Sequence, residues 1–270
     1  MNKKLNIINI ILIVFALLFT GCATVSVNTY QDGKSLGKGG VRIGAGAEMS
    51  PLKNYGLFPP DVDPADPTKF KVFIEEADTD VDSTLYYWGV YNLLVQYGVT
   101  DNIDLGIMPF MGATFLNYGG KVLLKYGLMD QPGGLNAAVV PYFGLGTLGT
   151  TEDTSTVATG GPWELNTFAY NTTYWGLDIP VGFSDWGYVV FKIYQDKLTG
   201  KFVYYEEGEF NPELDVRTSF GVNVGVDTPG EYGRIEVGAM YEKTPQEDWY
   251  PRAYVGYNKF FTFGGKKNKK

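Results

Sequence analysis

Residues 214–227 read Leu-Asp-Val-Arg-Thr-Ser-Phe-Gly-Val-Asn-Val-Gly-Val-Asp and alternate in character along their whole length. The even positions carry apolar side chains or Thr, and the odd positions carry charged or polar side chains or Gly. A period of two places these two sets on opposite faces of a β-strand. The alternation also runs longer than the average strand of about 5–6 residues. One face suits lipid and the other suits a wet interior, which is typical of a transmembrane β-barrel strand.

The same alternation recurs through residues 40–263. The predicted strands cover residues 41–48, 85–97, 103–115, 120–128, 135–149, 163–183, 188–205, 214–227, 234–242 and 249–263, with a hairpin expected inside 188–205 around Asp196 to Lys201. Short linkers largely alternate with longer ones such as 49–83 and 150–162. Single-chain bacterial barrels have an even strand number, short turns on one side and longer loops on the other. The sequence therefore predicts an all-β, up-and-down antiparallel transmembrane β-barrel of about ten strands, with both termini on the short-turn side.

A soluble β-sandwich or a lipocalin-like barrel is the alternative fold. Such a protein also alternates, but it buries its apolar face and exposes its charged face. The outward face predicted here is rich in aromatic side chains, among them Tyr97, Trp175, Tyr241 and Trp249. Tyr and Trp at strand ends are typical of the interfacial girdles of membrane proteins. We therefore favour the membrane barrel.

The N-terminus has the features of an export signal. Met-Asn-Lys-Lys precedes an apolar run from Ile7 to Phe19 and then Thr20-Gly21-Cys22, which describes a secretory signal. The run is shorter than the ~20 residues that a transmembrane helix needs. Phe-Thr-Gly-Cys resembles the lipobox of bacterial lipoproteins, which are cut before the Cys and acylated on it. The resemblance implies acylation of Cys22, and Ala23, rather than Asp, implies export to the outer membrane; an ordinary signal peptide is the alternative.

Four segments follow from these patterns. We expect a lipoprotein signal peptide over 1–21, a lipidated polar tether over 22–39, the barrel over 40–263 and a basic tail over 264–270. Two stretches resemble parts of small outer-membrane barrels: residues 98–106 resemble a periplasmic turn with its following strand, and Phe261-Thr262-Phe263 resembles an aromatic terminal signal. Because both termini fall on the short-turn side, we expect a bacterial outer-membrane protein that is lipid-anchored on the periplasmic side.

The absence of His limits the chemistry. The known outer-membrane barrel enzymes, namely the omptin-type proteases, the phospholipase and the lipid A deacylase, are similar in architecture and use a catalytic His. Ser-His and Asp-His sites are therefore excluded here. Paired carboxylates could still act as acid and base, but the inward acids alternate with Arg and Lys, which favours an ion-pair network, so we expect no enzymatic activity. A net charge of −8 argues against nucleic acid as a partner.

The acidic loop 49–83 is permissive for cations, because calcium takes clustered oxygen ligands. Its spacing lacks the Gly and Glu of a hand-type loop, so we interpret it as a solvated acidic surface and expect no metal or other cofactor. The acids concerned are Asp61, Asp63, Asp66, Asp78, Asp80 and Asp82.

Charges of both signs occupy inward positions of the predicted strands, which is typical of a lumenal ion-pair network. The candidate lumen-lining residues are Arg42, Glu48, Asp104, Lys125, Asp178, Asp215, Arg217, Arg234 and Glu236. Inward glycines such as Gly144, Gly176 and Gly225 remove side-chain volume, which either opens a slim pore or makes room for inward tyrosines and arginines.

Ten strands leave at most a narrow passage, since eight give an interior that side chains just fill. We therefore expect a lipid-anchored narrow channel or transport barrel for ions or small solutes. The alternative is a plugged structural or surface-interaction barrel that binds a partner through acidic extracellular loops. In both cases the expected partners are the diacylglycerol on Cys22 and the outer-membrane bilayer, and the sequence identifies no protein partner.

Overall fold

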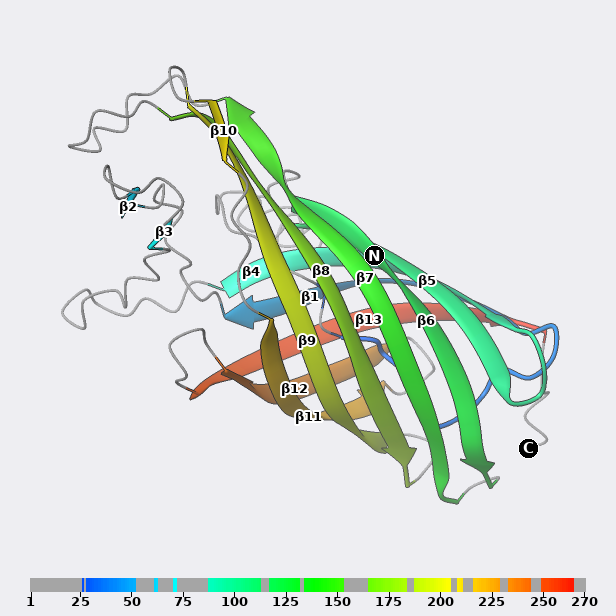
Figure 1. The fold of residues 1–270 in the computed structure, drawn as a ribbon. Helices are drawn as coiled ribbons and strands as arrows, with labels where there is room; N and C mark the ends of the chain where they lie inside the picture. Colours follow the sequence, from blue (N-terminus) through cyan, green and yellow to red (C-terminus); the bar gives the residue numbers. More distant parts are fainter. Residues whose placement is uncertain are drawn as a thin grey trace, which may run out of the picture.

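The computed structural model describes residues 26, 28–51, 61–62, 70–71, 87–112, 117–131, 134–152, 165–183, 187–204, 208–210, 216–228, 233–243 and 249–264. Antiparallel strands close into one barrel, in which each strand pairs with the next along the wall and the last pairs with the first (Figure 1). Around the wall these are β1 (Val41–Pro51), β4 (Tyr87–Gly98), β5 (Ile103–Gly112), β6 (Asn117–Asp130), β7 (Asn136–Glu152), β8 (Leu165–Gly182), β9 (Gly187–Tyr204), β11 (Arg217–Asp227), β12 (Arg234–Lys243) and β13 (Trp249–Phe263). Outside the wall, β2 (Asp61–Val62) pairs with β3 (Phe70–Lys71), and β10 (Gly208–Phe210) pairs with β9. Within these described ranges, no helix is long and apolar enough to cross a membrane.

This architecture confirms the predicted all-β, up-and-down barrel of ten strands. Within residues 214–227, β11 begins at Arg217; Val216 precedes it and belongs to no strand, and Leu214 and Asp215 lie outside the described residues. The hairpin predicted inside 188–205 is wrong, because β9 runs unbroken from Gly187 to Tyr204. Thr199 and Gly200, which resemble a turn in sequence, pair instead with Asn171 and Tyr170 of β8. This pairing carries both strands through the expected turn.

The barrel has two different ends. At one end lie the connections from β4 to β5, β6 to β7, β8 to β9 and β11 to β12, all of them short, together with the start of β1 and the end of β13, where Val41 pairs with Phe263 (Figure 1). At the other end β7, β8 and β9, with 17, 18 and 18 residues, project beyond the remaining strands. We call these the short-turn end and the long-strand end. In bacterial barrels the short turns face the periplasm and the longer loops face the cell exterior.

The outer wall of the barrel is apolar and the inner wall is polar. In β11, Phe220, Val222 and Val224 are 47, 46 and 49 % exposed, whereas Ser219 and Asn223 are buried. The same strict alternation of exposed and buried side chains runs along β5. Soluble monomers rarely expose contiguous apolar patches larger than a few hundred Å². The soluble sandwich and the lipocalin-like barrel, which bury the apolar face, therefore do not fit this wall.

A lipid-facing Arg tests which medium contacts this wall. We expect Val222→Arg, in the middle of β11, to lower the free energy of unfolding by about 2–4 kcal/mol, since that is the cost of Arg near the bilayer midplane. Val216→Arg is the matched control, because Val216 is equally exposed but precedes β11 at the long-strand end, where the cost is about 0–1 kcal/mol. Urea unfolding in lipid vesicles measures both variants. Equal and small losses at the two positions would show that water contacts the wall.

Candidate functional site

The lumen of the barrel contains part of the chain itself. Ser26 and the residues from Asn28 to Gly40 precede β1, and we call them the lumen segment. They run through the barrel to the short-turn mouth, where Lys38 and Gly39 are exposed. Ser26, Asn28, Thr29 and Tyr30 are each 0 % exposed although none belongs to a strand. The sequence suggested a lipidated polar tether over residues 22–39, and the structure places the described part of this stretch in the lumen. Polar residues that look like a linker in sequence can be buried here because the inner wall offers them charged partners.

The lumen segment meets β1 through a glycine turn at the short-turn end. The backbone N–H of Gly39 donates to the carbonyl of Gly98 at 2.8 Å, and the N–H of Gly98 donates to the carbonyl of Gly40 at 2.7 Å. Gly37 and Gly39 have φ values of 77° and 76°, a region that glycine occupies without the steric cost borne by other residues. The chain thus descends through the lumen, reverses at the short-turn mouth and ascends as β1.

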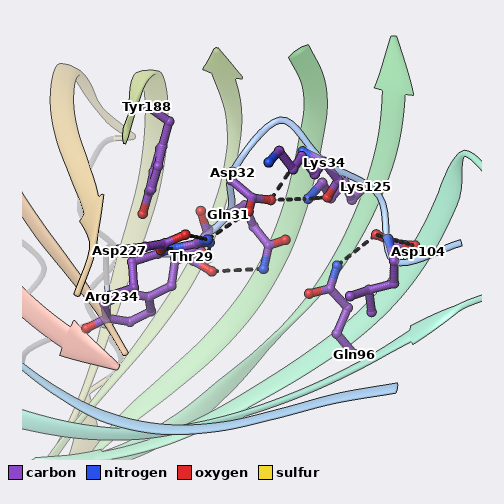
Figure 2. A network of polar contacts seen from close by, with 12 residues as sticks. Thr29, Gln31, Asp32, Lys34, Gln96, Asp104, Lys125, Tyr188, Asp227 and Arg234 are labelled. Atoms are coloured by element: carbon purple, nitrogen blue, oxygen red, sulfur yellow. Dashed lines mark hydrogen bonds and ion pairs between the residues drawn. The ribbon is translucent and has the colours of Figure 1, made fainter. Parts of the chain in front are cut away.

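An ionic cluster holds the lower part of the lumen segment (Figure 2). Asp32 accepts hydrogen bonds from Lys125 Nζ of β6 at 3.0 Å and from Arg234 Nη2 of β12 at 2.7 Å. Arg234 also donates to both carboxylate oxygens of Asp227, at 2.6 and 3.1 Å, and to the carbonyl of Tyr30 at 2.9 Å. Buried charges of this kind need partners, because a buried charge left alone is costly. The lumen segment therefore supplies the carboxylate that the cations of the wall require.

Asp104 of β5 forms a second attachment near the same end. The backbone N–H of Leu36 donates to both carboxylate oxygens of Asp104, at 3.2 and 3.1 Å. Gln96 of β4 donates to the same carboxylate at 3.1 Å, as Figure 2 shows. A buried carboxylate with two kinds of N–H donors is satisfied by charge-assisted hydrogen bonds. Asp104 thus fixes the segment just above the glycine turn.

Nearer to its start, the segment contacts three more charged side chains of the wall. Ser26 Oγ donates to Glu48 of β1 at 2.9 Å. Lys121 Nζ of β6 donates to the carbonyls of Ser26 and Asn28, at 2.9 and 2.5 Å. Thr29 Oγ1 donates to Asp178 of β8 at 2.5 Å. These contacts come from strands on different sides of the barrel, so the segment is held across the lumen and not against one wall.

Two further buried groups extend this network. Lys192 of β9 forms an ion pair with Asp178 at 2.7 Å. The Tyr188 hydroxyl donates to Glu236 at 2.6 Å, and Asn223 Nδ2 lies 3.4 Å from the same carboxylate and 3.2 Å from Asn28 Oδ1. Within the described ranges, no group of three or more Cys, Asp or Glu side chains is arranged to hold a metal ion. The wall carboxylates instead bind amide, hydroxyl and ammonium groups of the protein.

Between the polar clusters, aromatic and aliphatic side chains pack in the middle of the lumen. The rings of Phe110 on β5 and Tyr174 on β8 lie 6.4 Å apart between centroids, and Tyr174 lies 5.8 Å from Tyr194. Because β6 and β7 separate β5 from β8 along the wall, this contact crosses the interior. The buried apolar cluster comprises Tyr30, Val90, Leu94, Met108, Phe110, Leu123, Val140, Tyr142, Tyr174, Tyr194, Met240 and Tyr254.

Inward glycines make room for these tyrosines. A Cβ added at Gly144 would collide with the Tyr174 ring, and one added at Gly176 would collide with the Tyr142 ring. Gly225 stands in the same relation to Tyr188. Of the two interpretations of the glycines, the structure favours accommodation of tyrosines over an open pore.

The structure places most of the predicted lumen residues inside the barrel. The residues that are buried and bonded to the segment are Glu48, Asp104, Lys125, Asp178 and Arg234. Glu236 is also buried, and its partners are Tyr188 and Asn223 of the wall. Arg42 is half-buried; its guanidinium lies 5.3 Å from the Phe260 ring centroid, and its Nε and Nη1 have no hydrogen-bond partner. Arg217 occupies a β11 position paired with Asp196, but its side chain, like Asp215 and Cys22, lies outside the described residues.

Sequence reasoning missed three parts of the site. Lys192 and Tyr188 occupy alternate inward positions of β9, so the period of two in that strand could have found them. Asp32 could not be found in this way, because it belongs to no strand.

The fold is a closed, up-and-down antiparallel β-barrel, and the solved structures that it resembles include barrels of bacterial outer membranes. No protein-family model matches the chain, and no curated protein matches it. Among solved structures, it is similar to Ail of Yersinia pestis, with 10% identity, TM-score 0.31 and coverage of 83% of this chain and 99% of that one. The COG4313 outer membrane channel of Pseudomonas putida F1 matches with 13% identity, TM-score 0.34 and coverage of 88% and 100%. These matches concern the barrel architecture and identify no single family.

The comparison corrects one prediction. The outer membrane protease OmpT of Escherichia coli also matches, with 9% identity, TM-score 0.38 and coverage of 83% of this chain and 93% of that one. One of the matched barrels is therefore an enzyme, and the prediction that this chain has no enzymatic activity is corrected on this finding. That prediction is withdrawn; the match itself assigns no reaction to this chain.

Proposed function

We propose that this chain is a lipid-anchored outer-membrane barrel whose lumen is sealed by its own lumen segment. The observation that carries the proposal is the complete burial of Ser26, Asn28, Thr29 and Tyr30 within the ring of strands. A passage for solutes needs water along the axis, and here the axis is filled by main chain and by packed tyrosines. Of the two functions expected from the sequence, the plugged structural or surface-interaction barrel thus has more support here than the narrow channel or transport barrel.

Membrane insertion and lipidation support each other in this proposal. The apolar wall needs lipid around it, and a closed barrel leaves no unpaired strand edge in the bilayer. Acylation of Cys22 would add a second attachment, as the lipobox resemblance implies. A partner that meets the protein from outside would contact the long-strand end, where β7, β8 and β9 project (Figure 1). Loop 49–83, with eight acids against three lysines, would offer that partner a negative surface.

A second candidate function is a narrow channel that opens only when the segment leaves. It is favoured by the nature of the contacts, which are mostly hydrogen bonds and ion pairs to wall residues. If the segment withdrew, Lys121, Lys125 and Glu48 would lose their present partners in it and face the lumen. Such a lining of mixed charge would suit small ions or polar solutes. Tyrosines carried by the wall would still limit the width.

Conductance in planar lipid bilayers tests both candidates. We expect the wild-type protein to show no conductance steps, because the lumen is sealed. A variant that lacks residues 26–36 but keeps the glycine turn should show steps if the segment alone closes the barrel. Stable open steps in the wild-type protein would contradict the sealed lumen. A folded deletion variant without steps would reject the gated channel, since the wall would then close the passage by itself. Migration on a denaturing gel with and without boiling confirms that each variant is folded.

A further inference from the structure

The height of Ser26 inside the barrel limits where the preceding residues can go. Ser26 is bound to Glu48, which lies seven residues above the first residue of β1, Val41, and only three residues below the last, Pro51. It is also bound to Lys121, which lies nine residues from the short-turn end of β6 and four from its other end. Two strands on different sides of the barrel therefore agree that Ser26 lies in the half nearer to the long-strand end.

These positions translate into distances along the barrel axis. Strands rise about 3.3 Å per residue and tilt by about 35–45° in membrane barrels. The short-turn end of β1 is therefore roughly 16–19 Å below Glu48, and its other end is roughly 7–8 Å above. Cys22 stands four residues before Ser26, and four extended residues reach at most about 14 Å. The chain from Ser26 to Cys22 can reach the long-strand mouth but is too short to return to the short-turn mouth.

The lumen between Ser26 and the short-turn mouth is also occupied. Below Ser26 the lumen already holds the segment from Asn28 to Leu36 and its contacts with Asp178, Arg234 and Asp104. A second strand of chain would have to displace this network to run beside it. The length of the chain and the occupied lumen thus exclude an exit through the short-turn mouth for two independent reasons.

We propose that, while the lumen segment is seated, the chain before Ser26 leaves through the long-strand mouth and presents the mature N-terminus on the cell surface. This inference rests on the sealed lumen proposed above. It replaces the anchor expected on the periplasmic side: a lipid on Cys22 would lie at the outer face of the membrane. If the lipid on Cys22 lay in the periplasmic leaflet, the lumen segment would have to be out of the barrel. A periplasmic lipid anchor and a seated lumen segment are therefore incompatible.

Labelling of intact cells tests this topology. Thr24→Cys places a thiol two residues after Cys22, and a membrane-impermeant maleimide reports whether it faces the exterior. We expect this variant to be labelled in intact cells at least tenfold more than Asn102→Cys, which lies in an exposed turn at the short-turn end. The wild-type protein gives the background from Cys22 itself. Labelling of Thr24→Cys only after permeabilisation, as expected for Asn102→Cys, would overturn the inference.

A disulfide between segment and wall separates this inference from the proposal on which it rests. Thr29 and Asp178 are in direct contact, so Thr29→Cys with Asp178→Cys should form a bridge in cells when the segment is seated. The bridge is read as a change in gel mobility on reduction. A bridged protein whose position 24 is accessible only from the periplasm would disprove the surface N-terminus and leave the sealed lumen standing. A folded protein without the bridge would disprove the sealed lumen itself.

Discussion

Asp32→Lys should drive the lumen segment out of the barrel. The carboxylate of Asp32 lies between Lys125 and Arg234, at 3.0 and 2.7 Å, and it is the group through which the segment satisfies both cations. An ammonium at this position would be surrounded by positive charge in a region that water does not reach freely. Removal of one partner from a buried ion pair typically costs about 3–5 kcal/mol, and reversal of its sign costs more. Because the segment is joined to the wall only through β1, it can leave while the barrel stays closed.

Hydrogen exchange measures this release directly. The N–H of Leu36 is protected by Asp104, and it should exchange freely once the segment is out. A loss of about 3–5 kcal/mol corresponds to exchange faster by roughly 10²–10⁴-fold, since 1.4 kcal/mol is a factor of ten. Amides of the barrel strands should keep their protection.

Two variants control for the change of charge. Asp101→Lys makes the same change at an exposed turn residue that accepts a hydrogen bond from the Lys38 N–H, and it should leave Leu36 protected. Asp32→Lys combined with Lys125→Asp restores an opposite-charge pair at the original site and should recover part of the protection. If Asp32→Lys left the exchange of Leu36 unchanged, the ionic cluster would not be what holds the segment.

The wall of this barrel could be predicted because the residues next to each other in the sequence determine which side chains face outward. A residue such as Phe220 or Val222 reveals its face through its immediate neighbours, since a strand repeats every two residues. Strand number and direction followed from the same pattern. The error at β9 arose where Thr199 and Gly200 have turn character and only their pairing with β8 keeps them extended. That pairing depends on residues far away in the sequence.

The contents of the lumen could not be predicted because they depend on distant partners. Residues 26–40 show no periodicity, so they look like a linker until their partners are known. Arg234 and Asp32 are 202 positions apart, and Asn28 and Asn223 are 195 apart. The inward charges could be identified residue by residue, but not the fact that a piece of the same chain neutralises them. For this reason the lumen segment was not predicted.

Gly256→Leu should displace the lumen segment by volume, without any change of charge. A Cβ at Gly256 would collide with the hydroxyl of Tyr30 and would lie 2.6 Å from Asn28 Nδ2. Extra volume in a packed interior typically costs about 1–3 kcal/mol, and more where the neighbours cannot move. Here the neighbours belong to the segment, whereas Gly256 lies in β13 between its partners in β1 and β12. The segment is therefore the part that gives way.

The disulfide between Thr29→Cys and Asp178→Cys serves as the readout. We expect Gly256→Leu to reduce its yield at least tenfold, and Gly120→Leu to leave it unchanged, because the nearest atom to a Cβ at Gly120 is at an ordinary 3.5 Å on Pro109. Tyr30→Ala in the Gly256→Leu background removes side-chain volume from the segment to compensate for the volume that Leu adds to the wall. This double variant should restore the bridge. This size exchange can succeed only if Tyr30 and Gly256 touch inside the lumen. An undiminished bridge in Gly256→Leu alone would mean that the segment passes the wall by another path.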